Sequence, residues 1–272
     1  MTPPQRPATQ DVEQGPDRVS MKLHDGVAWI TLSNPGKRNS FTWRMYDQLA
    51  AIADDLAGRD DLSAVVFRGD PEDGFAAGTD IRQFSSFTSA EDGVQYERRV
   101  AAVVQKLLGI PVPTIALVEG AAVGAGLVVV LCCDIVVAER GARFGAPIAR
   151  TLGNCLPAAV IARLRSRVGV NMAAGMLLAA ALVPAEALTA VGFVFELVEP
   201  GGLPDAAENL LRRIRMSAPL SVRSLKQLLR RVEDSAPAVP DEDLLALCYG
   251  SGDFHEGVLA FLADRRPHWT GR

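Results

Sequence analysis

Hydrophobic and polar positions along the first half of the chain form a pattern that predicts strands alternating with helices. Four short apolar runs, each bounded by glycine, proline or polar residues, are typical of buried strands. These runs cover residues 27–32, 64–67, 114–118 and 135–138. Because helical segments separate them, the pattern favours an α/β fold built from strand–helix–strand units.

Three helices are expected between these strands. The first begins after Thr42, which can cap it, and places Leu49 and Leu56 on one face. The second covers residues 89–108 and ends before a pair of prolines. The third, Leu127–Cys133, is apolar on all sides and is therefore expected to be buried.

Helical patterns dominate the second half of the chain. They cover residues 156–166, 171–181, 185–191, 204–216, 219–233, 241–250 and 254–264. The polar, proline-rich stretch 1–18 is expected to be a disordered leader. A boundary near residue 200 divides the predicted core, 19–200, from a helical C-terminal region, 201–272.

The composition excludes several classes of protein. The 272 residues carry a net charge of −4 and 22% of them are charged, so neither nucleic acid nor a membrane surface is an expected partner. No apolar run reaches the roughly 18 residues of a membrane span, and the N-terminal stretch lacks the apolar core of a signal peptide. The four cysteines show neither a disulfide pattern nor zinc-site spacing, so no metal is expected. The sequence predicts a cytoplasmic protein.

A loop of small residues follows the second predicted strand. The segment 75–81 reads FAAGTDI. Small side chains let a backbone approach a ligand closely, Gly78 can adopt a positive φ, and Asp80 can cap the short helix that follows. Taken alone, the segment is better explained as an ordinary turn.

A second loop, glycine-rich, joins the third strand to the buried helix. The segment 118–127 reads VEGAAVGAGL. Free N–H groups at the start of a helix stabilise an anion or a developing oxyanion. A dinucleotide-binding loop is a rival explanation, but Val129 stands where its third glycine is needed. Close packing of strand and helix without any ligand is another.

Together with four further segments, the two loops resemble the crotonase superfamily of enoyl-CoA hydratases and isomerases in order and spacing. The further segments are 26–39 (GVAWITLSNPGKRN), Asp134-Ile135, 144–147 (FGAP) and 254–266. The resemblance extends over residues 20–272. It implies a crotonase-like spiral of ββα turns followed by a helical trimerisation region, with a homotrimer or a dimer of trimers as the expected assembly.

The same resemblance implies an active site that takes an acyl-CoA thioester as its substrate and needs no cofactor. The backbone N–H groups of Thr79 and Ala125 are expected to form an oxyanion hole, since two preorganised donors stabilise an enolate-like oxygen. The residues expected to bind CoA and the substrate are Lys37, Arg38, Ala77, Gly78, Asp80, Ile81 and Gly124.

The chain departs from the family's hydratases at both of their catalytic glutamates. Val128 and Ile148 stand at these positions, and neither can transfer a proton. Asn154 and Glu119 are the polar candidates near the expected pocket. Cys155 is a candidate nucleophile, although nothing in the sequence indicates the lowered pKa that a reactive thiol needs.

Two classes of function therefore stay open. One is an acyl-CoA enzyme of the lyase or isomerase class, in fatty-acid or related acyl-CoA metabolism. Its reaction would be an isomerisation, a decarboxylation, a thioester hydrolysis or a hydration by relocated groups. The other is an acyl-CoA-binding protein with little catalysis. An oxyanion hole favours the enzyme, because a protein that only binds gains little from stabilising an enolate.

Overall fold

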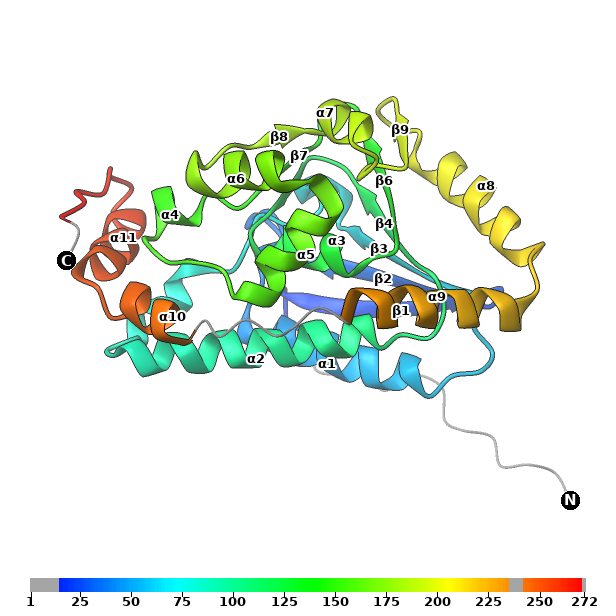
Figure 1. Cartoon of the computed structure of the whole chain (residues 1–272), viewed down its shortest axis with the longest axis horizontal. Coiled ribbons are helices and arrows are strands. Elements are labelled where there is room, and N and C mark those ends of the chain that lie inside the picture. The colour runs from blue at the N-terminus through cyan, green and yellow to red at the C-terminus, as the bar shows by residue number, and fades with distance from the viewer. Residues whose placement is uncertain (1–14, 235–241, 271–272) are drawn as a thin grey trace, which may run out of the picture.

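The computed structural model describes residues 15–234 and 242–270, which fold around a six-stranded sheet (Figure 1). The strand order is β1-β2-β3-β4-β6-β9; β1 and β2 are antiparallel, and every other neighbouring pair is parallel. The strands are β1 (Arg18–His24), β2 (Val27–Ser33), β3 (Ala64–Gly69), β4 (Thr114–Val118), β6 (Ile135–Glu139) and β9 (Glu196–Val198). The predicted α/β class is confirmed.

Helices cover both faces of this sheet. On β2, Ala28 and Ile30 face the main hydrophobic core, while Val27 faces the opposite side, because successive side chains of a strand alternate. The helices over the main core are α1 (Trp43–Ala57), α2 (Ala90–Leu108), α3 (Ala125–Cys132) and α5 (Ala158–Val168). On the other face, α8 (Leu203–Arg215) packs against the sheet through residues such as Leu210, and its end lies near α9 (Pro219–Asp234) in Figure 1.

A second, three-stranded sheet lies above the buried helix. Its strands are β5 (Ala121–Val123), β7 (Arg143–Gly145) and β8 (Val183–Pro184), in the order β5-β7-β8. The remaining helices are the 3₁₀ turns Pro71–Asp73 and Ile81–Ser86, α4 (Ile148–Thr151), α6 (Val170–Leu178), α7 (Ala185–Ala190), α9 (Pro219–Asp234), α10 (Glu242–Tyr249) and α11 (Gly252–Leu262). In the part of the chain that the structure describes, no helix has the length and apolarity needed to cross a bilayer.

The two long helices expected in the first half of the chain are confirmed, and so is the cap at Thr42. The Thr42 side chain accepts a hydrogen bond from the N–H of Met45 at the start of α1. Ser89 and Asp92 form a reciprocal capping box at the start of α2. Each device satisfies N–H groups that have no partner within the helix, which stabilises it by about 1 kcal/mol.

Several short elements were not expected from the sequence. The strands β5, β7, β8 and β9 have only two or three residues each, and β5 lies inside the glycine-rich segment 118–127 that was expected to be a loop. Residues 1–14 of the predicted leader lie outside the described residues. Its predicted end is too late, because residue 18 already belongs to β1 and the Asp17 carboxylate accepts a hydrogen bond from the Thr42 hydroxyl at 2.5 Å.

The C-terminal helices α10 and α11 fold back onto the same chain. α10 lies along α2 (Figure 1), and Tyr249, at its end, is fully buried. A Cβ atom placed on Gly93 of α2 would lie 2.0 Å from Cγ of the Tyr249 ring. Glycine at residue 93 is therefore what lets this ring approach α2. The ring then belongs to a small aromatic core with Phe84 and Phe254.

Candidate functional site

A cavity of about 700 Å³, counted to its open mouth, lies where the two small-residue loops meet α2 and the segment 147–160. Most of its wall is apolar. The polar side chains that line it belong to Tyr46, Thr79, Tyr96, Glu97, Thr151 and Asn154. A mainly apolar cavity with a few converging polar groups is the usual form of a small-molecule site.

The two loops that the sequence singled out are hydrogen-bonded to each other. The N–H of Ala76 donates to the carbonyl of Ala121, and the N–H of Val123 donates to the carbonyl of Ala76, both at 2.9 Å. Gly126 is required beside them, because a Cβ there would lie 2.1 Å from the carbonyl oxygen of Ala76. The first turn of α3 is thereby held directly against the loop that contains residue 79.

Gly78 and Gly124, the residues before the two expected donors, lie against each other. Both have positive φ, 108° and 53°, which glycine adopts without strain. A Cβ on Gly124 would lie 3.4 Å from the Cα of Gly78. Thr79 and Ala125 follow these glycines and line the same cavity.

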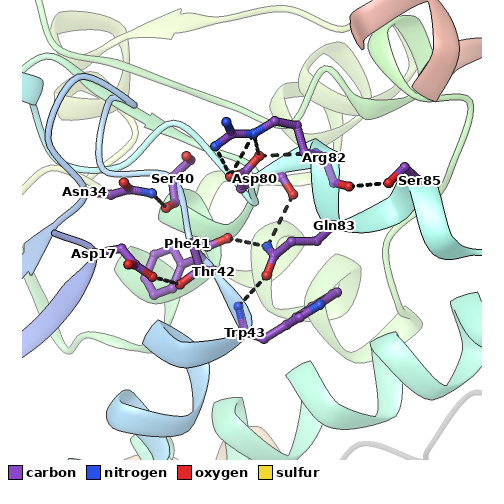
Figure 2. A network of polar contacts seen from close by, with 10 residues as sticks. All are labelled: Asp17, Asn34, Ser40, Phe41, Thr42, Trp43, Asp80, Arg82, Gln83 and Ser85. Carbon is purple, nitrogen blue, oxygen red and sulfur yellow. Dashed lines mark hydrogen bonds and ion pairs between the residues drawn. The ribbon is translucent and has the colours of Figure 1, made fainter. Parts of the chain in front are cut away.

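A polar network fixes the loop of residues 79–82 from outside the cavity (Figure 2). The Gln83 side chain accepts from the N–H of Trp43 at 2.6 Å and donates to the carbonyl of Phe41 at 3.1 Å. Phe41 also bonds Gly78 and Asp80 through its backbone, both at 2.8 Å. The loop is therefore tied to the start of α1 at several points, as a preorganised site requires.

The hydroxyl of Thr79 lies between two buried tyrosines. Its Oγ1 is 2.8 Å from the Tyr46 hydroxyl and 2.9 Å from the Tyr96 hydroxyl. Burial raises the pKa of Tyr46 to about 12 and raises the pKa of Tyr96 well above its ordinary value. Both phenols therefore keep their protons near neutral pH and act as hydrogen-bonding groups.

A second polar group on the cavity wall joins three distant parts of the chain. Glu97 of α2 is only 5% exposed and accepts a hydrogen bond from the Tyr249 hydroxyl. That hydroxyl in turn accepts from the side-chain amide of Asn154 at 2.9 Å. The Oδ1 atom of Asn154 is buried and has no hydrogen-bond partner among the described residues.

Most of the site residues expected from the sequence line the cavity. They are Ala77, Gly78, Thr79, Ile81, Gly124, Ala125 and Asn154. Asp80 caps the 3₁₀ turn outside it, where a hydrogen bond from Arg82 and the nearby charge of Lys37 lower its pKa. Lys37 and Arg38 are exposed, and the carbonyl of Arg38 accepts from the N–H of Ala77 at 2.9 Å.

Glu119 does not lie at the cavity, contrary to the expectation that it serves there. It directly follows β4 and is not among the lining residues, and partial burial, then the charge of Glu139, raise its pKa. Val128 and Ile148 do line the cavity, so its wall is apolar at both positions where the resemblance places glutamates. Cys155 is not among the lining residues, although its neighbour Asn154 is.

Glu97 and its partner Tyr249 were missed by reasoning from the sequence. A signal for Glu97 was present, because Val94, Glu97 and Val100 fall on the buried stripe of α2 at helical spacing. A carboxylate on such a stripe must find a partner. No clustering of three or more potential metal ligands occurs in the described ranges.

Known proteins are similar to this chain over nearly its whole length. The family model for enoyl-CoA hydratase/isomerase matches residues 22–272. The chain is 30% identical to 1,2-epoxyphenylacetyl-CoA isomerase of Escherichia coli over 258 residues, which are 92% of this chain and 97% of that protein. It is also 30% identical to 2,3-dehydroadipyl-CoA hydratase of the same organism, over 90% of this chain and 96% of that protein.

Solved structures agree as well. An enoyl-CoA hydratase/carnithine racemase from Magnetospirillum magneticum superposes with a TM-score of 0.76 at 27% identity, covering 93% of this chain and 96% of that one. A methylmalonyl-CoA decarboxylase in complex with 2-nitronate-propionyl-CoA gives a TM-score of 0.83 at 25% identity, covering 93% and 98%. The fold is therefore the crotonase fold, and the chain belongs to the enoyl-CoA hydratase/isomerase family of the crotonase superfamily.

Proposed function

We propose that the cavity binds an acyl-CoA thioester with its carbonyl oxygen between the backbone N–H groups of Thr79 and Ala125. The observation that supports this proposal is the contact between Gly78 and Gly124, since the two residues that follow them, Thr79 and Ala125, line one cavity. Two relatives named for acyl-CoA substrates, an isomerase and a hydratase, support the substrate class.

The hydrogen-bonding pattern around the two donors supports the same role. Phe41 bonds the carbonyl of Gly78 and the N–H of Asp80, as in a parallel bridge, so the N–H of Thr79 points to the other side. Ala125 is the first residue of α3, so its N–H has no acceptor within the helix and lies at the positive end of the helix dipole. Two such donors stabilise the negative oxygen of an enolate.

We place CoA along the exposed side of the first loop. Lys37 and Arg38 are exposed and supply positive charge there for phosphate groups, and Ala77, which lines the cavity, donates its N–H to the carbonyl of Arg38. The proposed activity is that of a lyase or isomerase on an acyl-CoA in fatty-acid or related metabolism. An acyl-CoA-binding protein without turnover is the alternative, since Val128 and Ile148 cannot transfer protons.

The first test is ligand binding. Butyryl-CoA and longer saturated acyl-CoAs are expected to bind more tightly than free CoA, because the thioester oxygen and the acyl chain gain contacts that CoA alone lacks. Isothermal titration calorimetry on the purified protein measures the difference. If no acyl-CoA binds more tightly than CoA, the proposed function is wrong.

We also expect a trimer or a hexamer, because α9 contacts the rest of the chain through polar side chains and leaves its apolar side facing solvent. Lys226 donates to the carbonyl of Val112 and pairs with Asp134, both at 2.7 Å, and Arg223 donates to the carbonyl of Asp60 at 3.0 Å. Five apolar side chains of α9 are more than half exposed; they are Leu220, Leu225, Leu228, Leu229 and Val232. An apolar surface of this kind marks a protein interface.

Light scattering at micromolar concentration measures the assembly directly, and a stable monomer would contradict the prediction. The double substitution Leu225→Glu with Leu229→Glu places two charges on the apolar side of α9 and is expected to lower the mass toward that of one chain. Gln227→Glu, an exposed change on the same helix, is the matched control and should leave the mass unchanged.

A further inference from the structure

The cavity wall contains a single carboxylate among the described residues, and it belongs to Glu97. No histidine, lysine, arginine, cysteine or aspartate side chain lines the cavity with it. The other titratable groups there, Tyr46 and Tyr96, keep their protons near neutral pH because burial raises both pKa values. Glu97 is therefore the one lining side chain able to act as a Brønsted base.

The groups around Glu97 orient it. The hydrogen bonds run in one direction, from the Asn154 amide to the Tyr249 hydroxyl and from that hydroxyl to the carboxylate. Burial, together with the charge of Glu97, raises the pKa of Tyr249, so this phenol stays a donor. A donor to a carboxylate stabilises its charge and fixes its position. The packing of Tyr249 against Gly93 holds that donor in place.

A second observation points to a ligand beside this network. The Oδ1 of Asn154 is buried on the cavity wall with no partner among the residues described. A buried polar atom without a partner is costly, so it is expected to meet a donor when the site is occupied. Glu97 and this oxygen therefore form a polar part of the cavity wall that can contact a polar or reacting group of a ligand.

We propose that Glu97 is the proton-transfer group of this site, replacing the glutamates that are absent at residues 128 and 148. The inference rests on the proposed binding of an acyl-CoA thioester. The Cα–H bond of the acyl group breaks and its proton moves to the Glu97 carboxylate. The bonding pair forms a double bond to the carbonyl carbon, and the carbonyl π pair moves to the oxygen held by residues 79 and 125. The reverse step returns a proton from Glu97 to carbon.

This step needs no co-reactant other than the thioester itself. Return to the same carbon exchanges the α hydrogen with solvent. Return to the γ carbon of a 3-enoyl thioester moves the double bond into conjugation. A single carboxylate can carry out both half-steps, whereas hydration must also activate water. The geometry thus favours isomerisation or a related enolate reaction within the proposed class.

A purely structural role of Glu97, as the anchor for Tyr249, is the competing explanation. Glu97→Gln separates the two, because the glutamine carbonyl can still accept the Tyr249 hydroxyl while the amide cannot take a proton. Glu91→Gln is the matched control. It makes the same chemical change on the same helix, at an exposed residue that bonds Gln95 and does not line the cavity.

The experiment follows incorporation of deuterium into the α carbon of butyryl-CoA in deuterium oxide by mass spectrometry, beside calorimetric measurement of butyryl-CoA binding. The wild-type protein and Glu91→Gln are expected to exchange at equal rates. Glu97→Gln is expected to lose about 10²–10⁴-fold in exchange rate while its Kd for butyryl-CoA stays within about twofold of wild type, since binding does not use the proton.

An undiminished exchange rate in Glu97→Gln overturns the inference. So does a wild-type protein that binds butyryl-CoA but exchanges no hydrogen above the buffer rate; in that case the proposed binding function stands. If butyryl-CoA binds no better than CoA, the proposed function falls and the inference falls with it.

If Glu97→Gln fails to fold, Glu97→Asp replaces it in the experiment. That variant withdraws the carboxylate by one methylene and is expected to lose at least about tenfold, and an unchanged rate there also overturns the inference.

Discussion

Replacing Ala125 with proline is expected to lower the turnover of any acyl-CoA substrate by about 10²–10³-fold, equivalent to roughly 2.7–4 kcal/mol, because it removes one of two proposed oxyanion donors. The backbone accepts proline here. Ala125 is the first residue of α3, where proline's fixed φ fits, and Gly124 has a ψ of −116°, outside the α region that a following proline disfavours. The effect is measured as kcat/KM or as the α-hydrogen exchange rate.

Two controls accompany this variant. Ala125→Gly keeps the N–H group and costs only the roughly 1 kcal/mol of helix propensity that separates glycine from alanine, so its rate should stay near that of wild type. Thr79→Ala keeps the other N–H group and should cost far less than Ala125→Pro in rate. It removes the Oγ1 that bonds Tyr46 and Tyr96, so its main effect should be on the melting temperature. Equal rates in Ala125→Pro and Ala125→Gly would exclude the Ala125 N–H from the chemistry.

Hydration of crotonyl-CoA is expected to be weak or absent. The residues at the two hydratase positions, Val128 and Ile148, lie on the cavity wall and transfer no proton. General acid–base help is worth about 10²–10⁴-fold for each group. A single carboxylate at Glu97 cannot both activate water and deliver a separate proton at the same moment. The loss of enoyl absorbance with time measures the rate.

A binding measurement must stand beside this assay, because a weak rate can also reflect weak binding. Crotonyl-CoA should compete with butyryl-CoA for the site even though it is hydrated slowly. A turnover of about 10–10³ per second, typical of efficient enzymes, would contradict the prediction and show that other groups activate water.

The parts of the fold that were predictable are those with local signals. Thr42 and Ser89 mark helix starts by side chains that cap their own helices, and β4 is bounded by proline and glycine. The three-residue strands were invisible because a period of two cannot be recognised over so few residues. β1 alternates Val19, Met21 and Leu23 with polar residues, but this short pattern directly follows the polar leader and was not recognised as a strand.

The site was predictable to the same extent and for the same reason. The small-residue loops are local signals, and together with four further segments they support the resemblance that implies Thr79 and Ala125; both residues line the cavity. Glu97 depends on contacts that no local pattern contains. Its partner Tyr249 is 152 residues away, and Gly93 creates the space for that partner. From the sequence alone, a glycine inside a helix indicates only a low helix propensity.

The distance along the chain between Glu97 and Tyr249 also has a consequence for synthesis. At about 5–20 residues per second, translation places roughly 8–30 s between the two residues. Before the interval ends the nascent chain contains both small-residue loops, yet until residue 249 is added α2 lacks the aromatic ring that packs on Gly93. The growing polypeptide thus leaves Gly93 uncovered and lacks the hydroxyl group with which Tyr249 donates to Glu97. A chain that terminates early is expected to engage chaperones instead of acting as a partial enzyme.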